Sequence, residues 1–382
     1  MTDGTLRLVG GQVVTPSGTA EMLDVTVADG TIIAIESRPA TDADHVVDVS
    51  GMYVAPGFID LQLNGGWGHD FTSDPHSIGD VARRLPSTGV TAFLPTIVTS
   101  PATARWAALD SITALPADPG APAATPLGLH FEGPAISPKR PGAHDPRWIG
   151  LPGKDEIDAW THARGVAMVT LAPECDGAFD LIPSLVAAGV AVSVGHSECS
   201  PAVFAAACRA GVGMVTHLFN AMAPFSHRDP GLVGSVLGGD TFAGLICDGI
   251  HVDALAVNVA WRALGSQRTV LVTDAIAALG LDAAQARLGD VVVSIDETGV
   301  RTADGVLAGS NLSLDRAVRN LVEYTGCTPA EAISTVTRNP ASVLGIGDRG
   351  RIVVGARADI VVLDPSLHVM QTFVGGALAW RS

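Results

Sequence analysis

The rhythm of the central part of the chain restricts its possible folds more than any other feature. Between Phe58 and Asp274, short apolar runs alternate with longer stretches of helical pattern. This alternation is typical of strand–helix–strand units that build a parallel sheet. We predict eight strands, at Phe58–Leu63, Val90–Thr96, Leu127–Glu132, Ala167–Ala172, Val190–Val194, Gly213–His217, Phe242–Cys247 and Val270–Asp274.

Eight such units predict an α/β protein whose core is a (β/α)8 barrel of the TIM type. An open, doubly wound sheet is the alternative. The Gly-x-Gly-x-x-Gly motif that often accompanies that fold does not follow the first strand, so the barrel is favoured. Helical stretches separate most of the strands, as at Pro101–Leu115, Lys154–Ala163, Ala202–Ala210 and Ala254–Leu264.

Both ends of the chain show the two-residue alternation that is typical of strands. The N-terminal part includes an Asp-Gly hairpin turn at Ala28–Thr31, and a β pattern returns from Ala358 onward. A further hairpin is expected at Val291–Ile295 and Gly299–Thr302. We predict that the two ends pair into one small β-sandwich domain, with these boundaries: residues 1–54 and 346–382 for the β-sandwich, and residues 55–345 for the barrel.

The composition excludes several classes of protein. Hydrophobic residues make up 47% of the 382 residues and charged residues 16%, so the chain can bury a large core and is not disordered. A net charge of −16 argues against nucleic acid and anionic membranes as partners. The five cysteines form no Cys-x-x-Cys pair, and Met1-Thr2-Asp3-Gly4 does not resemble the start of a leader peptide. We therefore expect a cytoplasmic protein with no membrane span.

Two of the predicted strands end in a histidine. His196 ends the fifth strand, His217 ends the sixth, and a helix is predicted between them. The carboxyl ends of parallel strands lie at the same rim of a barrel, so we expect the two imidazoles to meet. A single histidine at a strand end often only binds a loop carbonyl. A matched pair favours a transition-metal site.

Other polar residues follow the same pattern. Glu132 ends the third strand and Asp274 the eighth, while Asn64 follows the first strand. A carboxylate at the end of an apolar strand is unfavourable unless it is paired or bound to a cation. One glutamate and two histidines make a zinc-type site with open positions, and Asp274 then suits a general base. The pattern predicts metal-assisted hydrolysis of an amide or a related bond.

A set of motifs in this order resembles one known family, the N-acetylglucosamine-6-phosphate deacetylases of the amidohydrolase superfamily. The set spans residues 56–310, and Gly355–Val361 resembles the usual C-terminal strand of the superfamily. The motifs are Pro56-Gly57-Phe58-Ile59-Asp60, His130-Phe131-Glu132-Gly133-Pro134, Gly195-His196-Ser197, Thr216-His217-Leu218-Phe219-Asn220-Ala221-Met222, Asp248-Gly249-Ile250-His251-Val252-Asp253, Val272-Thr273-Asp274-Ala275 and Leu307-Ala308-Gly309-Ser310.

The resemblance implies deacetylation of N-acetyl-D-glucosamine 6-phosphate to D-glucosamine 6-phosphate and acetate, in amino-sugar recycling. It implies one divalent ion per subunit, Zn²⁺ before other divalent ions, with Glu132, His196 and His217 as ligands and Asp274 as acid and base. It further implies a homodimer in which Arg228 serves the neighbouring active site. The residues implied around the sugar phosphate are Ala143, His144, Asn220, Ala221, Arg228, Asp248, His251, Leu307, Ala308 and Gly309.

The residues themselves leave some alternatives open. A guanidinium can bind phosphate through two hydrogen bonds, but His227 is a rival for that role and Arg228 could also be a surface residue. Where many superfamily members carry His-x-His, this chain has Gln62-Leu63-Asn64, and the fourth strand ends without a lysine. One metal is therefore expected, and a weaker second site stays open. The alternative functions are hydrolysis of cyclic amides, deamination of nucleobases, and a scaffold without catalysis.

Overall fold

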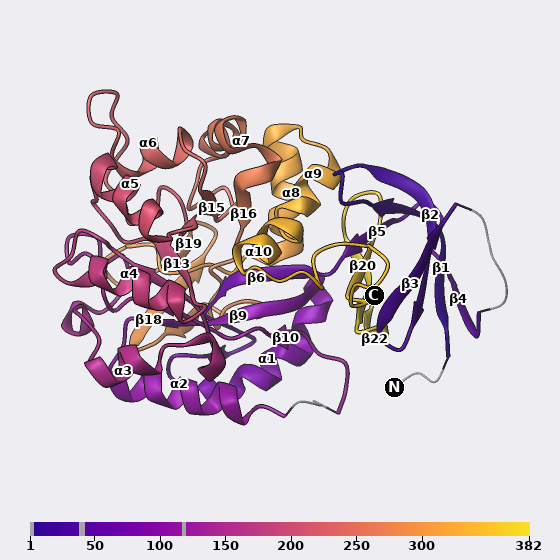
Figure 1. Cartoon of the computed structure of the whole chain (residues 1–382), viewed down its shortest axis with the longest axis horizontal. Coiled ribbons are helices and arrows are strands. Elements are labelled where there is room, and N and C mark those ends of the chain that lie inside the picture. The colour runs from indigo at the N-terminus through magenta and orange to yellow at the C-terminus, as the bar shows by residue number, and fades with distance from the viewer. Residues whose placement is uncertain (1–3, 38–42, 117–119) are drawn as a thin grey trace.

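The computed structural model describes residues 4–37, 43–116 and 120–382. Residues 1–3, on which the expected absence of a leader peptide partly rests, lie outside the described residues. The chain forms a barrel surrounded by helices and, beside it, a sheet built from both chain ends (Figure 1). Within the described residues, no helix has both the length and the apolar character needed to cross a membrane.

The barrel consists of eight parallel strands in chain order, which confirms the predicted (β/α)8 architecture. The ring closes where Asp274 N donates to Gln62 O at 2.9 Å and Thr273 Oγ1 donates to Asp60 Oδ2 at 2.6 Å. All six residues of the first barrel strand are buried. Its two polar side chains are hydrogen-bonded, Asp60 to Thr273, and Gln62 to Glu132 and Asp274. The strands are β6 (Phe58–Leu63), β9 (Val90–Val98), β11 (Leu129–Glu132), β12 (Val166–Leu171), β13 (Ala191–Val194), β14 (Met214–Val215), β15 (Phe242–Leu245) and β16 (Thr269–Leu271).

Helices cover the outside of the barrel. The helix between the two histidine-ending strands illustrates how local sequence sets the bounds: Ser200 caps its start by accepting a bond from Val203 N, Pro201 is its first residue, and Gly211 ends it in a left-handed conformation. The helices are α1 (Ile78–Arg84), α2 (Ala102–Ala114), α3 (Lys154–Ala159), α4 (Ala178–Ala187), α5 (Pro201–Ala210), α6 (Gly231–Leu237), α7 (Ala254–Arg268), α8 (Leu314–Thr325), α9 (Pro329–Ser334) and α10 (Arg338–Val343).

The two chain ends share one eight-stranded sheet, which confirms that they pair into a domain beside the barrel. The strand β5 pairs with β1 on one side and with β20 on the other, which joins the N-terminal to the C-terminal part. Residues from distant strands of this sheet, Leu8, Ile32 and Phe373 among them, enclose a core separate from that of the barrel. The strands are β1 (Leu6–Val14), β2 (Ala20–Ala28), β3 (Thr31–Glu36), β4 (His45–Asp48), β5 (Tyr53–Pro56), β20 (Ile360–Leu363), β21 (Val369–Val374) and β22 (Ala377–Arg381).

A small antiparallel sheet, the lid sheet, follows the last barrel strand. It contains the predicted hairpin, β18 (Val291–Asp296) and β19 (Gly299–Arg301), and a further strand, β17 (Gln285–Leu288). In the extra strand, exposed Gln285 and Arg287 alternate with the more buried Ala286 and Leu288. An alternation of only four residues is too short to predict a strand from sequence. The inner face of the lid sheet packs on Val98 and Ile276 at the carboxyl end of the barrel. The remaining short strands are β7 (Gly65–Gly66), β8 (His69–Asp70) and β10 (Thr125–Pro126).

Candidate active site

The residues predicted to carry the chemistry stand at the carboxyl ends of the barrel strands. Glu132 is the last residue of β11, while His196, His217 and Asp274 come two or three residues after β13, β14 and β16. The last three have left-handed backbones, with φ of 48°, 29° and 49°. Residues other than glycine rarely adopt such φ angles, and backbone strain of this kind clusters at functional sites. Each strand therefore ends in a sharp turn at a residue predicted to be functional.

Glu132, His196 and His217 meet at one point, and all three are buried. Glu132 Oε1 lies 3.1 Å from His196 Nε2 and 2.9 Å from His217 Nε2, and the two ring nitrogens are 3.2 Å apart. His196 Nδ1 lies 2.9 Å from Arg140 O, so Nδ1 carries the proton and Nε2 presents a lone pair to this point. Two imidazoles and one carboxylate directed in this way fit a divalent cation of the zinc type.

The charges in this cluster support the same fit. Burial lowers the pKa of His196 to about 4, so its imidazole is neutral. Burial acts against ionisation of Glu132, but the close approach of His144, His196 and His217 holds the pKa of this carboxyl well below its usual value. Burial acts in the same way on His217, but its contact with Glu132 outweighs this and raises the pKa of His217. A buried carboxylate held next to two imidazoles is a strong reason for a cation to bind.

Asp274 is held beside this cluster by two amides. Its Oδ1 accepts from Asn64 Nδ2 at 2.7 Å and from Gln62 Nε2 at 3.1 Å. Gln62 Nε2 also lies 3.1 Å from Glu132 Oε1. Burial, followed by the charge of Glu132, raises the pKa of Asp274 to about 6, which suits a group that must take and return a proton. Gln62 and Asn64 therefore direct N–H groups at the carboxylates of Asp274 and Glu132. Because an N–H group cannot ligate a cation, this arrangement does not favour a second metal ion between the amides and these carboxylates.

A cavity of about 280 Å³ opens above these groups. Besides Asp274 and the three clustered residues, it is lined by seven of the residues implied around the sugar phosphate: Ala143, His144, Asn220, Ala221, His251, Leu307 and Gly309. Two of the others lie behind the wall. Ala308 is buried in the core of the lid sheet, and Asp248 Oδ2 holds His251 Nδ1 at 2.7 Å while its Oδ1 accepts from the backbone of Ile250 and His251.

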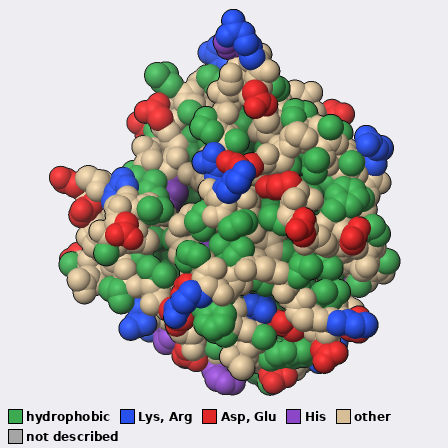
Figure 2. All heavy atoms as spheres, turned by 90° about the vertical axis from the view of Figure 1, so that its left-hand side faces the viewer, with side chains coloured by type: hydrophobic (Ala, Val, Ile, Leu, Met, Phe, Trp, Pro, Cys, Tyr) green, Lys and Arg blue, Asp and Glu red, His purple; other side chains and the backbone are tan. Residues whose placement is uncertain are grey.

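Arg228 stands apart from the cavity that its own chain forms. It belongs to the exposed segment 224–229, which precedes α6. In Figure 1 this part of the chain projects beyond the body of the molecule, at the top of the view. Figure 2 shows Lys or Arg and His side chains at the tip of a projection at the same height. The structure thus brings the implied phosphate ligands together only in part.

Sequence reasoning missed several residues of the cavity wall. Val98 and Leu288 are apolar residues whose pattern indicates only a core position, and Gly142 and Val306 carry no chemical signal. Arg301 also lines the cavity. The sequence predicts it only as part of a hairpin, because nothing in a local sequence shows that a hairpin lies over a barrel opening.

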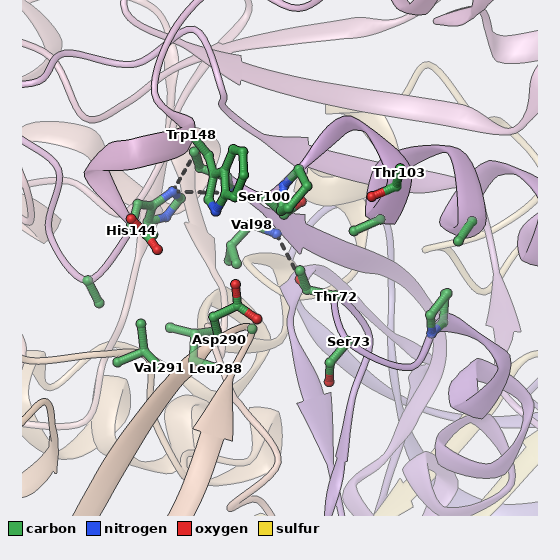
Figure 3. A pocket seen from close by; sticks show the side chains of 18 residues that line it. Thr72, Ser73, Val98, Ser100, Thr103, His144, Trp148, Leu288, Asp290 and Val291 are labelled. Carbon is green, nitrogen blue, oxygen red and sulfur yellow. Dashed lines mark hydrogen bonds between the residues drawn. The ribbon is translucent and has the colours of Figure 1, made fainter.

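A second cavity, of about 350 Å³, adjoins the first (Figure 3). The two share Val98, Ala143, His144 and Leu288 as lining residues. His144 is fixed between them, with Nδ1 2.8 Å from Thr99 Oγ1 and Nε2 3.7 Å from Glu132 Oε2. In Figure 3 the lid-sheet residues Leu288, Asp290 and Val291 form the side opposite Trp148. The lid sheet therefore bounds both cavities.

Comparison with known proteins now gives the class. The model of the amidohydrolase family matches residues 53–379, which is most of the chain. A cluster of candidate metal ligands at the carboxyl ends of the barrel strands agrees with the metal dependence of that family. The chain belongs to the amidohydrolase family.

Individual relatives narrow this class. N-acetylglucosamine-6-phosphate deacetylase of Rattus norvegicus is 40% identical over 361 residues, which cover 89% of this chain and 86% of the relative. N-acetylgalactosamine-6-phosphate deacetylase of Escherichia coli O157:H7 is 37% identical, with 96% and 97% covered. An Asp-to-Ala variant of the Mycobacterium smegmatis N-acetyl-D-glucosamine-6-phosphate deacetylase, solved with N-acetyl-D-glucosamine 6-phosphate, superposes with a TM-score of 0.89 at 30% identity, covering 98% and 99%. Within the amidohydrolases, the chain thus belongs with the N-acetylglucosamine-6-phosphate deacetylases.

Proposed function

We propose that this chain hydrolyses N-acetyl-D-glucosamine 6-phosphate to D-glucosamine 6-phosphate and acetate, as a step of amino-sugar recycling. The observation that carries the proposal is the meeting of Glu132, His196 and His217 beside Asp274, within a cavity at the barrel rim. The relatives named above support the choice of substrate.

The chain's own groups account for the proton transfers. Asp274 takes a proton from water as the water oxygen attacks the acetyl carbonyl carbon, and returns it to the sugar nitrogen as the carbon–nitrogen bond breaks. Asn64 and Gln62 occupy Oδ1 of Asp274, while Oδ2 has no hydrogen bond with any described residue and is available for this transfer. When bound, a divalent cation supplies Lewis-acid polarisation of the carbonyl.

Glu132, His196 and His217 would hold that cation, and we favour a single Zn²⁺ per chain. Two imidazoles and a carboxylate are a common zinc donor set, although other divalent ions accept it as well. Asp248 contributes indirectly, because it fixes the ring of His251 at the cavity. Ala308 contributes through its backbone position between Leu307 and Gly309, which both line the cavity.

The proposal extends to a cytoplasmic homodimer in which Arg228 completes the neighbour's phosphate site. The supporting observation is that Arg228 projects from its own subunit and lies outside the cavity of that subunit. A residue with this placement can act across a two-fold axis, where each subunit would supply one arginine to the other.

The test combines metal analysis of the purified protein with acetate release. We expect about one tightly held divalent ion per chain and rapid release from N-acetylglucosamine 6-phosphate. Cyclic amides and nucleobases should react far more slowly. Faster turnover of a cyclic amide would replace the proposal with another amidohydrolase activity, and a metal-loaded protein that hydrolyses no amide would indicate a scaffold.

N-acetylgalactosamine 6-phosphate is a second candidate substrate, because one relative of similar identity is named for it. The two sugars differ only in the orientation of the 4-hydroxyl, so the same chemistry serves both. Comparing kcat/KM for the two epimers decides between them. We expect the glucose epimer to be preferred.

A further inference from the structure

The cavity has an unfavourable electrostatic setting for a phosphorylated substrate. Glu132 and Asp274 place two carboxyl groups in its wall, and the chain carries a net charge of −16. A phosphate dianion therefore needs a local cation. Among the described residues that line the cavity, Arg301 is the single lysine or arginine.

The lid sheet fixes the position of Arg301. In β19, Val300 packs into the lid-sheet core together with Ala308, while Arg301 and Leu307 line the cavity. Arg301 forms a bridge with Leu307 across the turn that follows β19, and Ala308 N donates to Val300 O at 3.0 Å. Side chains alternate between the two faces of a strand, so this register directs Arg301 to the cavity face.

The start of β19 also lies against the loop that carries His251. A Cβ added at Gly299, whose φ is 112°, would lie 2.9 Å from Ile250 Cγ2 and 3.2 Å from Leu307 Cδ2. This close approach requires glycine. It places Arg301 and His251 on adjoining parts of one wall, so both can face the same substrate group.

The guanidinium of Arg301 has neutral partners. Nη1 donates to Gly305 O at 2.9 Å, Nη2 donates to Thr298 O at 3.1 Å, and Nε lies 3.4 Å from Thr298 Oγ1. No carboxylate of the described residues forms an ion pair with it; the nearby Asp296 accepts instead from Thr298, at its N and Oγ1. Arginine has five N–H groups, and these three bonds leave two for a ligand.

We propose that Arg301 binds the phosphate group of the substrate and makes the site selective for phosphorylated sugars. The inference rests on the proposed function and adds to it a phosphate ligand from the same chain, carried by the lid sheet. It does not depend on a dimer. The competing interpretation is that Arg301 only ties the turn between Thr298 and Gly305.

The test compares Arg301→Gln with Arg301→Lys, and uses Arg287→Gln as the matched control. Arg287 is an exposed residue of β17 in the same lid sheet and lies outside the cavity lining, so its loss removes the same charge. For each variant, kcat/KM is measured on N-acetylglucosamine 6-phosphate and on unphosphorylated N-acetylglucosamine. Thermal unfolding checks the fold of each variant.

We expect Arg301→Gln to lower kcat/KM by about 10- to 100-fold on the phosphorylated sugar, the range for a charged hydrogen bond, and to change it little on the other. Arg301→Lys should recover part of the loss, and Arg287→Gln should match the wild type. Equal losses on both sugars, or no loss on either, would overturn the assignment.

A binding measurement separates failure of this inference from failure of the proposed function. Calorimetry with D-glucosamine 6-phosphate, and with glucosamine as control, reports phosphate recognition without turnover. If the wild type hydrolyses neither sugar yet binds the phosphorylated one through Arg301, only the proposed reaction fails. If the wild type prefers the phosphorylated substrate and Arg301→Gln keeps that preference, only Arg301 is misassigned.

Discussion

The strand ends of the barrel and the loops around them contribute to the site in different ways. Glu132, His196 and His217 are each at most 4% exposed. They lie at or just after the ends of strands that are paired with a neighbour on both sides. Arg301 is half-buried on the lid sheet, and Arg228 is exposed on a projecting loop. The residues proposed to act in bond breaking thus lie on the barrel framework. The two arginines proposed to bind the phosphate lie outside it, on the lid sheet and on a loop.

This contrast has a physical basis. Metal ligation and proton transfer lose most of their effect when atoms move by about 1 Å, so they require positions set by many backbone hydrogen bonds. Phosphate recognition is longer in range and tolerates a more mobile cation. Substitutions at the strand ends should therefore abolish a step, and substitutions on the loops should change selectivity by graded amounts.

The largest effect is expected for His217→Ala. It removes one of three ligands at a point where two imidazoles and a carboxylate meet, so the bound ion should fall from about one per chain to near zero. Activity should fall by at least ~10³-fold with it. Elemental analysis after dialysis measures the ion, and His368→Ala, an exposed histidine just before β21, is the control.

Two ions per wild-type chain that resist dialysis would contradict the single-metal proposal. Retention of the ion by His217→Ala would show that the cluster is not the metal site. Either result would weaken the distinction between strand ends and loops, because the strand ends would no longer hold the reaction centre alone.

Asp274→Asn should give the next largest effect. Asparagine is nearly isosteric but cannot accept the proton from water, so kcat should fall by about 10²–10⁴-fold while the metal stays bound. Acetate release and metal content, measured on the same preparation, distinguish this from loss of the ion. Near-normal turnover in a metal-loaded variant would remove Asp274 from the proposed mechanism.

The same contrast explains how much the sequence could predict. Barrel strands have apolar runs that end abruptly, so the position of His196 relative to His217 follows from the fold class alone. The eight strands and the pairing of the chain ends were therefore predictable. The resemblance of the motifs added the wall residues Ala143, Asn220 and Leu307, which carry no chemical signal of their own.

The lid sheet shows where such prediction stops. Arg301 lies in a hairpin that the sequence indicates, but its distance from Glu132 along the chain says nothing about the cavity. Its placement depends on the packing of its neighbour Val300 against Val98 and Ile276, two residues that are far apart in the sequence. Only tertiary structure gives such contacts. The role of Arg228 depends on a second subunit and stays a prediction.

The smallest effect is expected from subunit mixing, and it tests whether the phosphate ligand of the loop acts across subunits. Arg228→Ala should reduce kcat/KM for the phosphorylated sugar by about 10- to 100-fold.

The mixing experiment combines Arg228→Ala chains and Asp274→Asn chains in equal amounts. After reassembly, about half of the dimers are hybrids with one chain of each kind. If Arg228 serves the neighbour, one site of each hybrid carries both lesions and the other carries neither, by the symmetry of an isologous pair. The mixture should then regain roughly a quarter of wild-type activity. If Arg228 acts within its own chain, every hybrid site keeps one lesion, and mixing restores nothing. A mixture that stays inactive, with hybrid formation verified by differently tagged chains, would show that Arg228 does not act across subunits.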